Sequence, residues 1–309
     1  MLGRHANSLY CISRYFERVE NIVRKLQTVI YINLTKKDFL INEILNDTSE
    51  INEKDNFINI NDIESSINSI LRNRSNQKSI ISLIKNVRNN SKIVRNSLTR
   101  ETWQSINECW IKFDKVSKNK IHFQKIPEVL ENLLKDYLIF RGTVYSTLLR
   151  NDVYYFLEIG MFLERIENTT RVIRSNTEKT TFDVNIQKIN FNELESEILL
   201  RTLASWNSFN WLYNNNICEK YVLDYLLKDQ ISTRSLNFCY NELDNLTSKL
   251  CLLYNKKNIF SKNLKNRIIF INENINRFND KIVFKNFIRD STRIHHEFNE
   301  TLTEYFNFI

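Results

Sequence analysis

The chain has 309 residues but only 3 glycines and 1 proline, far below the average shares of about 7% Gly and 5% Pro. Because tight turns between strands depend on these residues, the composition disfavours a β-rich fold and indicates long helices. Hydrophobic residues make up 42% of the chain, which excludes disorder throughout, and the formal net charge of +8 fits either an anionic partner or a composition rich in Lys and Asn.

The first predicted helix covers about residues 3–36, because apolar residues recur along it at every third or fourth position. A polar segment, 38–62, follows it. The single proline, Pro127, opens a later helix, since proline is tolerated at the first helical position. The other predicted helices of this half cover about residues 63–72, 75–98, 99–116 and 152–174, and the helix at Pro127 ends near residue 149.

The second half begins after a predicted linker, 177–188. Asn190 and Glu193 have the spacing of a capping box and open a helix that ends near Tyr213. Further helices are predicted over about 218–228, 233–254, 261–278 and 281–306. We therefore predict an all-α fold, a single helical bundle of about nine or ten helices in one domain, 1–309, or in two closely packed halves, about 1–175 and 190–309.

Two segments of the chain repeat the same polar residues 147 positions apart. Residues 15–24 and 162–171 differ in their apolar side chains, but both carry Glu, Arg, Glu, Asn and Arg in the same places. Cores accept swaps among hydrophobes of similar size, and solvated faces accept almost any residue. A repeat kept only for packing should lose its polar residues, so a further constraint acts on these.

At about 100° per residue, Arg14 lies at the edge, and Arg18 nearer the apolar boundary, of an arc of about 100° that holds the other repeated polar side chains of each helix. We name them the first ridge and the second ridge, and we predict that the two helices pack near each other. In each ridge the last Glu and Arg have the spacing of a favourable i,i+4 ion pair. The first ridge consists of Arg14, Glu17, Arg18, Glu20, Asn21 and Arg24, and the second of Glu164, Arg165, Glu167, Asn168 and Arg171.

Three interpretations of the ridges stay open. They can form a buried polar network that fixes helix register, line a ligand pocket together, or lie in solvent as ion pairs worth about 0.3–0.5 kcal/mol each. A metal site is disfavoured, because helical bundles that hold two metals add a Glu-x-x-His motif and no His lies near either ridge.

The repeated segments stand among others that resemble one family. The chain opens with Met1-Leu2-Gly3-Arg4, the ridge segments each contain a Glu-Arg pair, and a Trp helix begins at Arg100 and contains Trp103 and Asn107. Asp229 and Thr233-Arg234-Ser235 follow in the expected order. Together these segments resemble the Alpha-E family, with Cys11 and Thr233 in place of the Trp and Pro usual there.

The resemblance implies an all-helical bacterial protein from gene clusters that also encode a circularly permuted ATP-grasp ligase and a transglutaminase-like protease. It thus implies an accessory component of a peptide or amide ligation and hydrolysis system, with those proteins as partners and a peptide as ligand. We predict that the residues of both ridges, together with Arg150 and Arg234, bind the peptide or partner. An enzyme with a cleft glutamate is the alternative, although no catalytic residue is predicted and the chain is expected to lack activity of its own.

The other features of the sequence support fewer conclusions. Three glycines cannot build a nucleotide-binding loop, so no cofactor is expected, and the four histidines lack metal-ligand spacing. A basic stripe runs along residues 78–95 and suggests a phosphate or acidic contact, or else a solvated face; nucleic acid is a less favoured partner. Trp206, Phe209 and Trp211 are predicted to be core or helix-interface aromatics.

The cysteines and the lack of apolar spans indicate the compartment. The five cysteines form no C-x-x-C pair, which fits buried thiols in a reducing cytosol better than a disulfide framework. No stretch approaches the roughly 18 apolar residues of a membrane span, and no export signal is visible. We therefore predict a cytoplasmic protein without a membrane partner.

Overall fold

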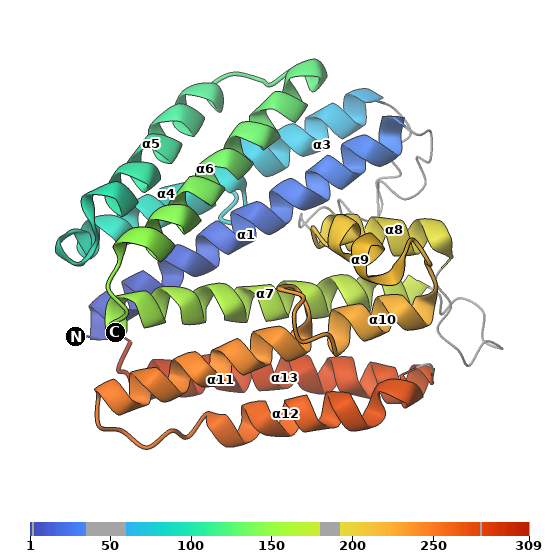
Figure 1. Cartoon of the computed structure of the whole chain (residues 1–309). Helices are drawn as coiled ribbons and strands as arrows, with labels where there is room; N and C mark the ends of the chain where they lie inside the picture. Colours follow the sequence, from blue (N-terminus) through green and yellow to red (C-terminus); the bar gives the residue numbers. More distant parts are fainter. Residues whose placement is uncertain (2, 35–59, 180–191, 279, 309) are drawn as a thin grey trace. The chain divides into compact units, whose positions relative to one another are not determined.

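The computed structural model describes residues 1, 3–34, 60–179, 192–278 and 280–308 (Figure 1). They form two compact units. The N-terminal unit is Ser8–Leu157, and the C-terminal unit is Glu158–Ile309 together with Met1–Asn7. The division falls inside helix α7, so the prediction of one domain or of halves at about 1–175 and 190–309 stays a prediction.

The helices of the N-terminal unit follow the predicted order. Two short 3₁₀ segments, η2 (Arg95–Ser97) and η3 (Phe123–Lys125), separate longer elements. The α-helices are α1 (Gly3–Leu34), α3 (Ile60–Arg72), α4 (Ile80–Ile93), α5 (Arg100–Val116), α6 (Ile126–Thr147) and the start of α7 (Asp152–Lys179).

The C-terminal unit contains the rest of α7 and the remaining helices. One 3₁₀ segment, η5 (Ile275–Arg277), extends α12. The α-helices are α8 (Glu193–Thr202), α9 (Trp206–Tyr213), α10 (Glu219–Leu227), α11 (Leu236–Leu253), α12 (Ser261–Asn274) and α13 (Lys281–Tyr305). None of the helices in the described ranges is both long and apolar enough to cross a membrane.

The all-helical class is confirmed, but the predicted number of helices is wrong. The described ranges contain 12 α-helices, not nine or ten. One cause is a break at Ala204, whose positive φ of 54° ends the predicted helix 190–213 and separates α8 from α9. Most of the predicted polar segment 38–62 and of the predicted linker 177–188 lies outside the described residues.

Side-chain caps set several helix starts. Thr99 accepts a hydrogen bond from the Thr102 amide at the start of α5. A complete capping box opens α8, and its residues are Asn192 and Glu195. Of the predicted pair, Asn190 lies outside the described residues, and Glu193 is the first residue of α8. Both pairs have the same spacing, and the sequence alone does not distinguish them.

The core of the N-terminal unit lies where the apolar face of α1 meets α6. Phe16 of α1 stacks on Phe140 of α6, with ring centroids 4.6 Å apart. α6 also packs on α5, and α5 on α4 (Figure 1). The apolar residues that predict α1 are all buried, namely Leu9, Ile12, Phe16, Val19, Val23, Leu26 and Ile30.

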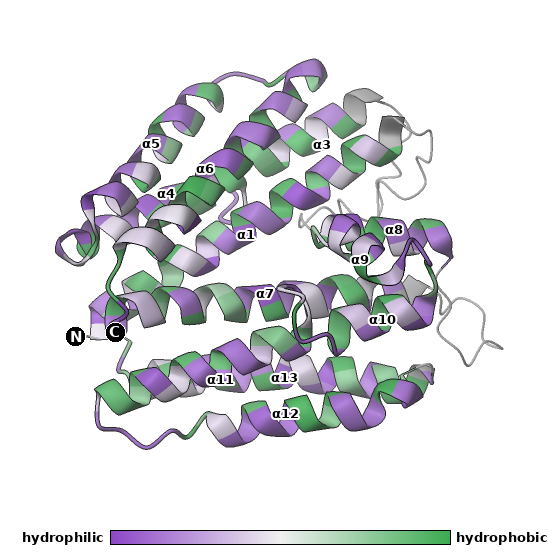
Figure 2. Ribbon diagram, viewed as in Figure 1, coloured by the Kyte–Doolittle hydropathy of each residue, from purple (hydrophilic) through white to green (hydrophobic). Residues whose placement is uncertain are grey.

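In the C-terminal unit, α11 packs on α12, and phenylalanines join α12 to α13. The rings of Phe270 and Phe287 lie parallel, with centroids 6.0 Å apart. Hydrophobic and hydrophilic residues interchange along α11 and α12, as expected for helices with one buried face (Figure 2). The amino terminus joins this unit, because the Met1 amine donates a hydrogen bond to the Tyr254 hydroxyl at 3.1 Å.

Candidate functional site

The first ridge lies on α1 in the N-terminal unit, and all of its acidic and amide side chains are buried. Glu17 is 0% exposed, and Glu20 and Asn21 are each 3% exposed. The three arginines of the ridge are half-buried. The first ridge is therefore not a face of ion pairs in solvent.

Glu17 is anchored by a residue that the sequence analysis does not identify. The hydroxyl of Tyr137, on α6, donates a hydrogen bond to the Glu17 carboxylate. The Tyr137 ring lies edge-on to Phe16, with centroids 6.3 Å apart. Tyr137 stands in a stripe of buried apolar residues on α6, where a polar tip needs a partner. That pattern is the signal that could have revealed it.

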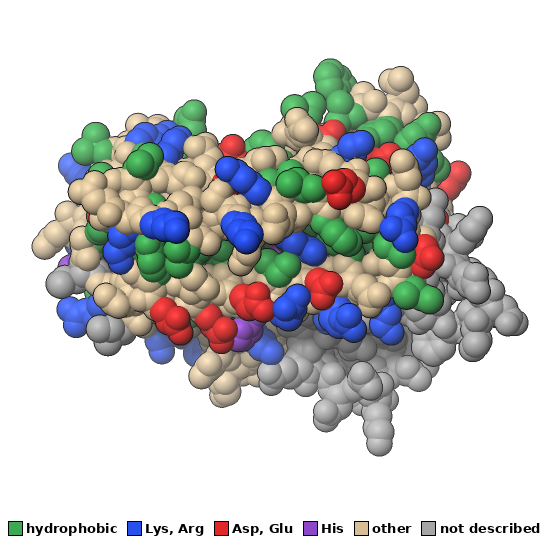
Figure 3. Space-filling view, turned by 90° about the horizontal axis from the view of Figure 1, so that it is seen from below, with side chains coloured by type: hydrophobic (Ala, Val, Ile, Leu, Met, Phe, Trp, Pro, Cys, Tyr) green, Lys and Arg blue, Asp and Glu red, His purple; other side chains and the backbone are tan. Residues whose placement is uncertain are grey.

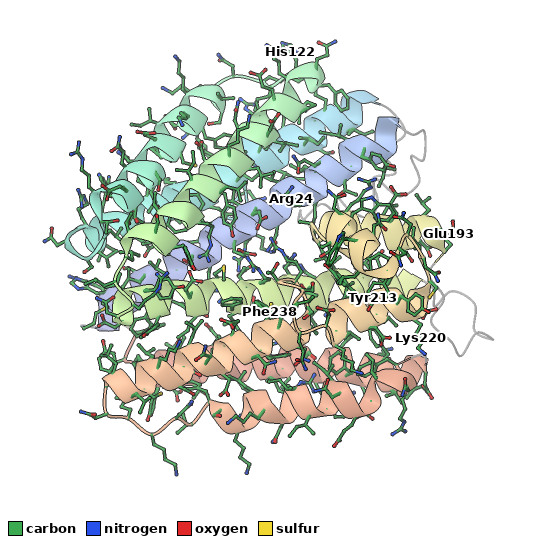
Figure 4. The ribbon with its side chains drawn as sticks, in the orientation of Figure 1. Arg24, His122, Glu193, Tyr213, Lys220 and Phe238 are labelled. Carbon is green, nitrogen blue, oxygen red and sulfur yellow. The ribbon has the colours of Figure 1, made fainter. Side chains whose placement is uncertain are left out.

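Arg24 differs from Glu17 in being open to solvent. Its side chain, labelled in Figure 4, is 28% exposed. Its Nε lies 3.5 Å from a carboxylate oxygen of Glu20, so the predicted i,i+4 ion pair is present. Within the described residues, the buried Arg24 Nε and Asn21 Nδ2 have no hydrogen-bond acceptor. Because a guanidinium carries five N–H donors, one carboxylate at this distance leaves donors of Arg24 available.

The second ridge lies on the part of α7 that belongs to the C-terminal unit, and its burial matches that of the first ridge at four of five positions. Glu164 and Asn168 are each 1% exposed, like Glu17 and Asn21. Arg165 and Arg171 are half-buried, like Arg18 and Arg24. The exception is Glu167, which is half-buried where Glu20 is buried. Thus the repeated polar set also repeats its exposure.

Side chains at the second ridge donate hydrogen bonds to the loop 229–235, which follows α10. Arg165 donates from Nη1 to the backbone oxygen of Thr233 at 3.2 Å. One helical turn on, the Thr169 hydroxyl donates to the backbone oxygen of Arg234 at 3.3 Å. Arg171 donates from Nη2 to the side-chain oxygen of Asn168 at 3.1 Å. The Glu-Arg helix and the Thr-Arg-Ser segment are therefore in contact within this unit.

The same loop contains Asp229 and Ser235, the Asp and Ser of the segment that resembles the Alpha-E family. Asp229 accepts hydrogen bonds from the amides of Ile231 and Ser232, at 2.8 and 2.6 Å. The Ser235 hydroxyl donates to the backbone oxygen of Asp229 and caps α11. Asp229 and Ser235 thus shape the loop, and the Arg234 side chain between them is buried at 9% exposure.

Two further predicted binding residues have local partners. Arg14 donates to the Tyr10 hydroxyl at 3.3 Å, one turn back on α1. Arg150 donates to the Tyr145 backbone oxygen at 2.8 Å, and its guanidinium lies 4.0 Å from the Tyr154 ring centroid. Its recorded hydrogen bonds and ring contacts in the described part of the chain are all with residues 145–154. Arg150 thus helps to close the end of α6.

Two cations of the basic stripe pack on the helix with the Trp motif. Arg88 donates to the Asn107 side chain at 3.0 Å and lies over the Trp110 ring. Arg95 lies over the Trp103 ring, with its guanidinium 5.2 Å from the centroid. These cation–π contacts join α4 and η2 to α5. They explain part of the stripe without an anionic partner, while Lys78, Lys85 and Lys92 are exposed.

The remaining charged and histidine side chains are dispersed. On the face of the C-terminal unit occupied by α12, acidic and basic side chains are interspersed (Figure 3). His295 is buried and shares a hydrogen bond of 2.6 Å with the Tyr240 hydroxyl, whereas His296 is exposed. Within the described ranges, no three His, Cys, Asp or Glu side chains are grouped as metal ligands.

The aromatic and cysteine predictions are only partly right. Phe209 is buried, but Trp211 is 79% exposed, so its assignment to a core or helix interface is wrong. All five cysteines are free thiols, and Cys109, Cys239 and Cys251 are buried. Burial raises the pKa of the Cys109 thiol, which makes it a poor nucleophile.

One comparison with known proteins gives a match. The model of the Alpha-E family, a predicted alpha-helical domain with a conserved ER motif, matches residues 1–306. No curated protein and no solved structure matches the chain. The matched range includes both Glu-Arg ridges and the Thr-Arg-Ser segment.

Proposed function

Because the chain belongs to the Alpha-E family, we propose that it is a binding component of an amide-forming or amide-cleaving system. Its partners under this proposal are an ATP-grasp ligase, a transglutaminase-like protein or both, encoded nearby in a bacterial genome, and its ligand is a peptide. The partner carries out the chemistry. This chain recognises the partner and the peptide through the two ridges, and it does so in the cytoplasm.

The repeated exposure of the ridges is the observation that carries this proposal. In both ridges a buried acid and a buried amide stand beside two half-buried arginines. Buried Glu17 and Glu164 are too enclosed to meet a ligand, so they orient the neighbouring side chains. The half-buried arginines Arg18, Arg24, Arg165 and Arg171 are the groups that can meet carboxylates of a peptide or partner.

Arg24 and Arg171 provide the test of this proposal. We expect Arg24→Gln and Arg171→Gln each to weaken binding to the purified neighbouring ligase by about tenfold or more, because a charge-assisted hydrogen bond contributes about 1.5–3 kcal/mol. Arg24→Lys keeps the cation next to Glu20 but loses the planar fork, so it should recover only part of the affinity. Isothermal titration calorimetry measures each dissociation constant.

Lys92→Gln is the matched control, since it removes one positive charge from an exposed position of α4. Its dissociation constant should equal that of the unchanged chain. Equal affinities for all four variants would contradict recognition through the ridges. Turnover of a peptide by this chain alone would instead favour an enzyme.

A further inference from the structure

A small cavity in the C-terminal unit has no ridge residue among those that line it. It has a volume of about 240 Å³ and is lined by residues of α9, α10 and the 229–235 loop. Pockets for drug-sized ligands usually enclose about 300–1,000 Å³. The cavity is therefore suited to a single residue-sized group.

The polar part of the cavity wall has one cation and no anion. Arg234 is the only charged residue among the ten that line it. Ser208 and Tyr225 also line it, and their hydroxyls are 2.7 Å apart. A site with these groups favours a ligand that carries a negative charge and accepts hydrogen bonds.

Ser232 adds an unused hydrogen-bonding group to this wall. Its side chain is 7% exposed, and its Oγ has no hydrogen-bond partner among the described residues. Buried hydroxyls are normally hydrogen-bonded, because an unpaired one has lost its water without compensation. A ligand oxygen in the cavity would supply the partner that Ser232 lacks.

The cavity wall also contains apolar residues that are open to solvent. Trp211 is 79% exposed and Ile231 is 69% exposed, and both line the cavity. Ala204, also in the wall, has a positive φ of 54°, a conformation that is unfavourable for a residue with a Cβ atom. An indole in this position can cover an apolar side chain of a ligand.

We propose that this cavity binds the C-terminal residue of a peptide that ends in an aromatic or aliphatic side chain. Arg234 and the Ser232 hydroxyl hold the terminal carboxylate, while Trp211 and Ile231 cover the last side chain. A free amino acid fits less well, because no acidic residue lines the cavity to pair with its ammonium group. Phosphate also fits less well, because it makes no use of the apolar residues of the wall.

The proposal does not rest on the proposed function, since none of the ten lining residues belongs to a ridge. The test uses the full chain and the probe N-acetyl-Ala-Phe, compared with its C-terminal amide, free Phe and inorganic phosphate. Tryptophan fluorescence and isothermal titration calorimetry report binding. We expect the carboxylate peptide to bind about tenfold or more tightly than the other three probes.

Substitutions locate the binding within the cavity. Trp211→Ala and Ser232→Ala should each weaken binding of the carboxylate peptide with little change in thermal midpoint, because Trp211 is exposed and the Ser232 hydroxyl is unbonded. Arg234→Gln should remove the preference for the carboxylate over the amide. Leu252→Ala, at a 76% exposed position of α11, is the matched control and should not change the affinity.

Several outcomes would overturn the proposal. They are equal binding of the acid and the amide, equal or tighter binding of phosphate or free Phe, unchanged affinity in Trp211→Ala and Ser232→Ala, and no binding at millimolar peptide. If the ridge variants bind the ligase as tightly as the unchanged chain does, and the cavity binds the peptide as expected, only the proposed function is contradicted.

Discussion

Replacing Tyr137 by Phe should lower the free energy of unfolding by about 1.5–3 kcal/mol, because a hydrogen bond to a charged group is lost and the acceptor stays buried. The substitution keeps the ring against Phe16 and removes only the hydroxyl that bonds Glu17. Urea unfolding followed by far-UV circular dichroism measures the change.

Tyr145→Phe on the same helix is the control for this change. Tyr145 is 69% exposed, so the loss of its hydroxyl should change stability by less than about 0.5 kcal/mol. If Tyr137→Phe unfolds at the same urea concentration as the unchanged chain, the Tyr137 hydroxyl does not stabilise the buried Glu17 carboxylate.

Replacing Gly3 by Ala should lower the free energy of unfolding by about 1–3 kcal/mol, the usual cost of overpacking. A Cβ atom at position 3 would lie 1.6 Å from the backbone oxygen of Asn307, which follows α13 in the same unit. The backbone must shift to accept it, because no flexible side chain can move aside. Urea unfolding measures the loss, and hydrogen exchange of the first turn of α1 shows whether it is local.

Gly142→Ala is the matched control, since a Cβ atom there meets no atom within 4 Å. Gly142 lies inside α6, where Ala is favoured over Gly by about 0.8–1.0 kcal/mol. The two Gly→Ala changes should thus have opposite signs. An unchanged stability in Gly3→Ala would show that the amino terminus does not pack closely at Asn307.

The helices were predictable where periodicity and capping residues agree. Thr99 caps α5 next to the predicted start of that helix, whereas Ser235 caps α11 so that this helix begins at Leu236 and not at residue 233. The break between α8 and α9 was not, because Ala204 favours helices and only its surroundings impose a positive φ. Helix number therefore depends on tertiary contacts that a local pattern does not contain.

The ridges were predictable as sets of residues but not in their burial. Periodicity places Glu17 and Arg24 on one side of α1, but it gives no information on what covers that side. Acidic side chains are rarely buried unless they are paired, and the partner Tyr137 stands 120 residues away. The prediction that the two Glu-Arg helices pack near each other stays a prediction, because the two ridges belong to different compact units.

The basic stripe and the cavity show the same limit. Arg88 and Arg95 have the spacing of a solvated face, but Trp110 and Trp103 of the next helix lie against them. The cavity next to Trp211 is lined by a loop and two helices, and no spacing of residues in the sequence indicates it. Contacts between elements decide both cases.

The central claim is that the duplicated polar set is kept for recognition, and Glu164→Gln tests it most directly. This change removes one buried charge from the second ridge and nearly preserves the side-chain shape. We expect the far-UV helical signal to stay intact, while binding of the neighbouring ligase per folded molecule weakens by about tenfold, or 1.4 kcal/mol. A fall in the thermal midpoint with unchanged binding per folded molecule would contradict the claim and show that the ridge serves stability alone.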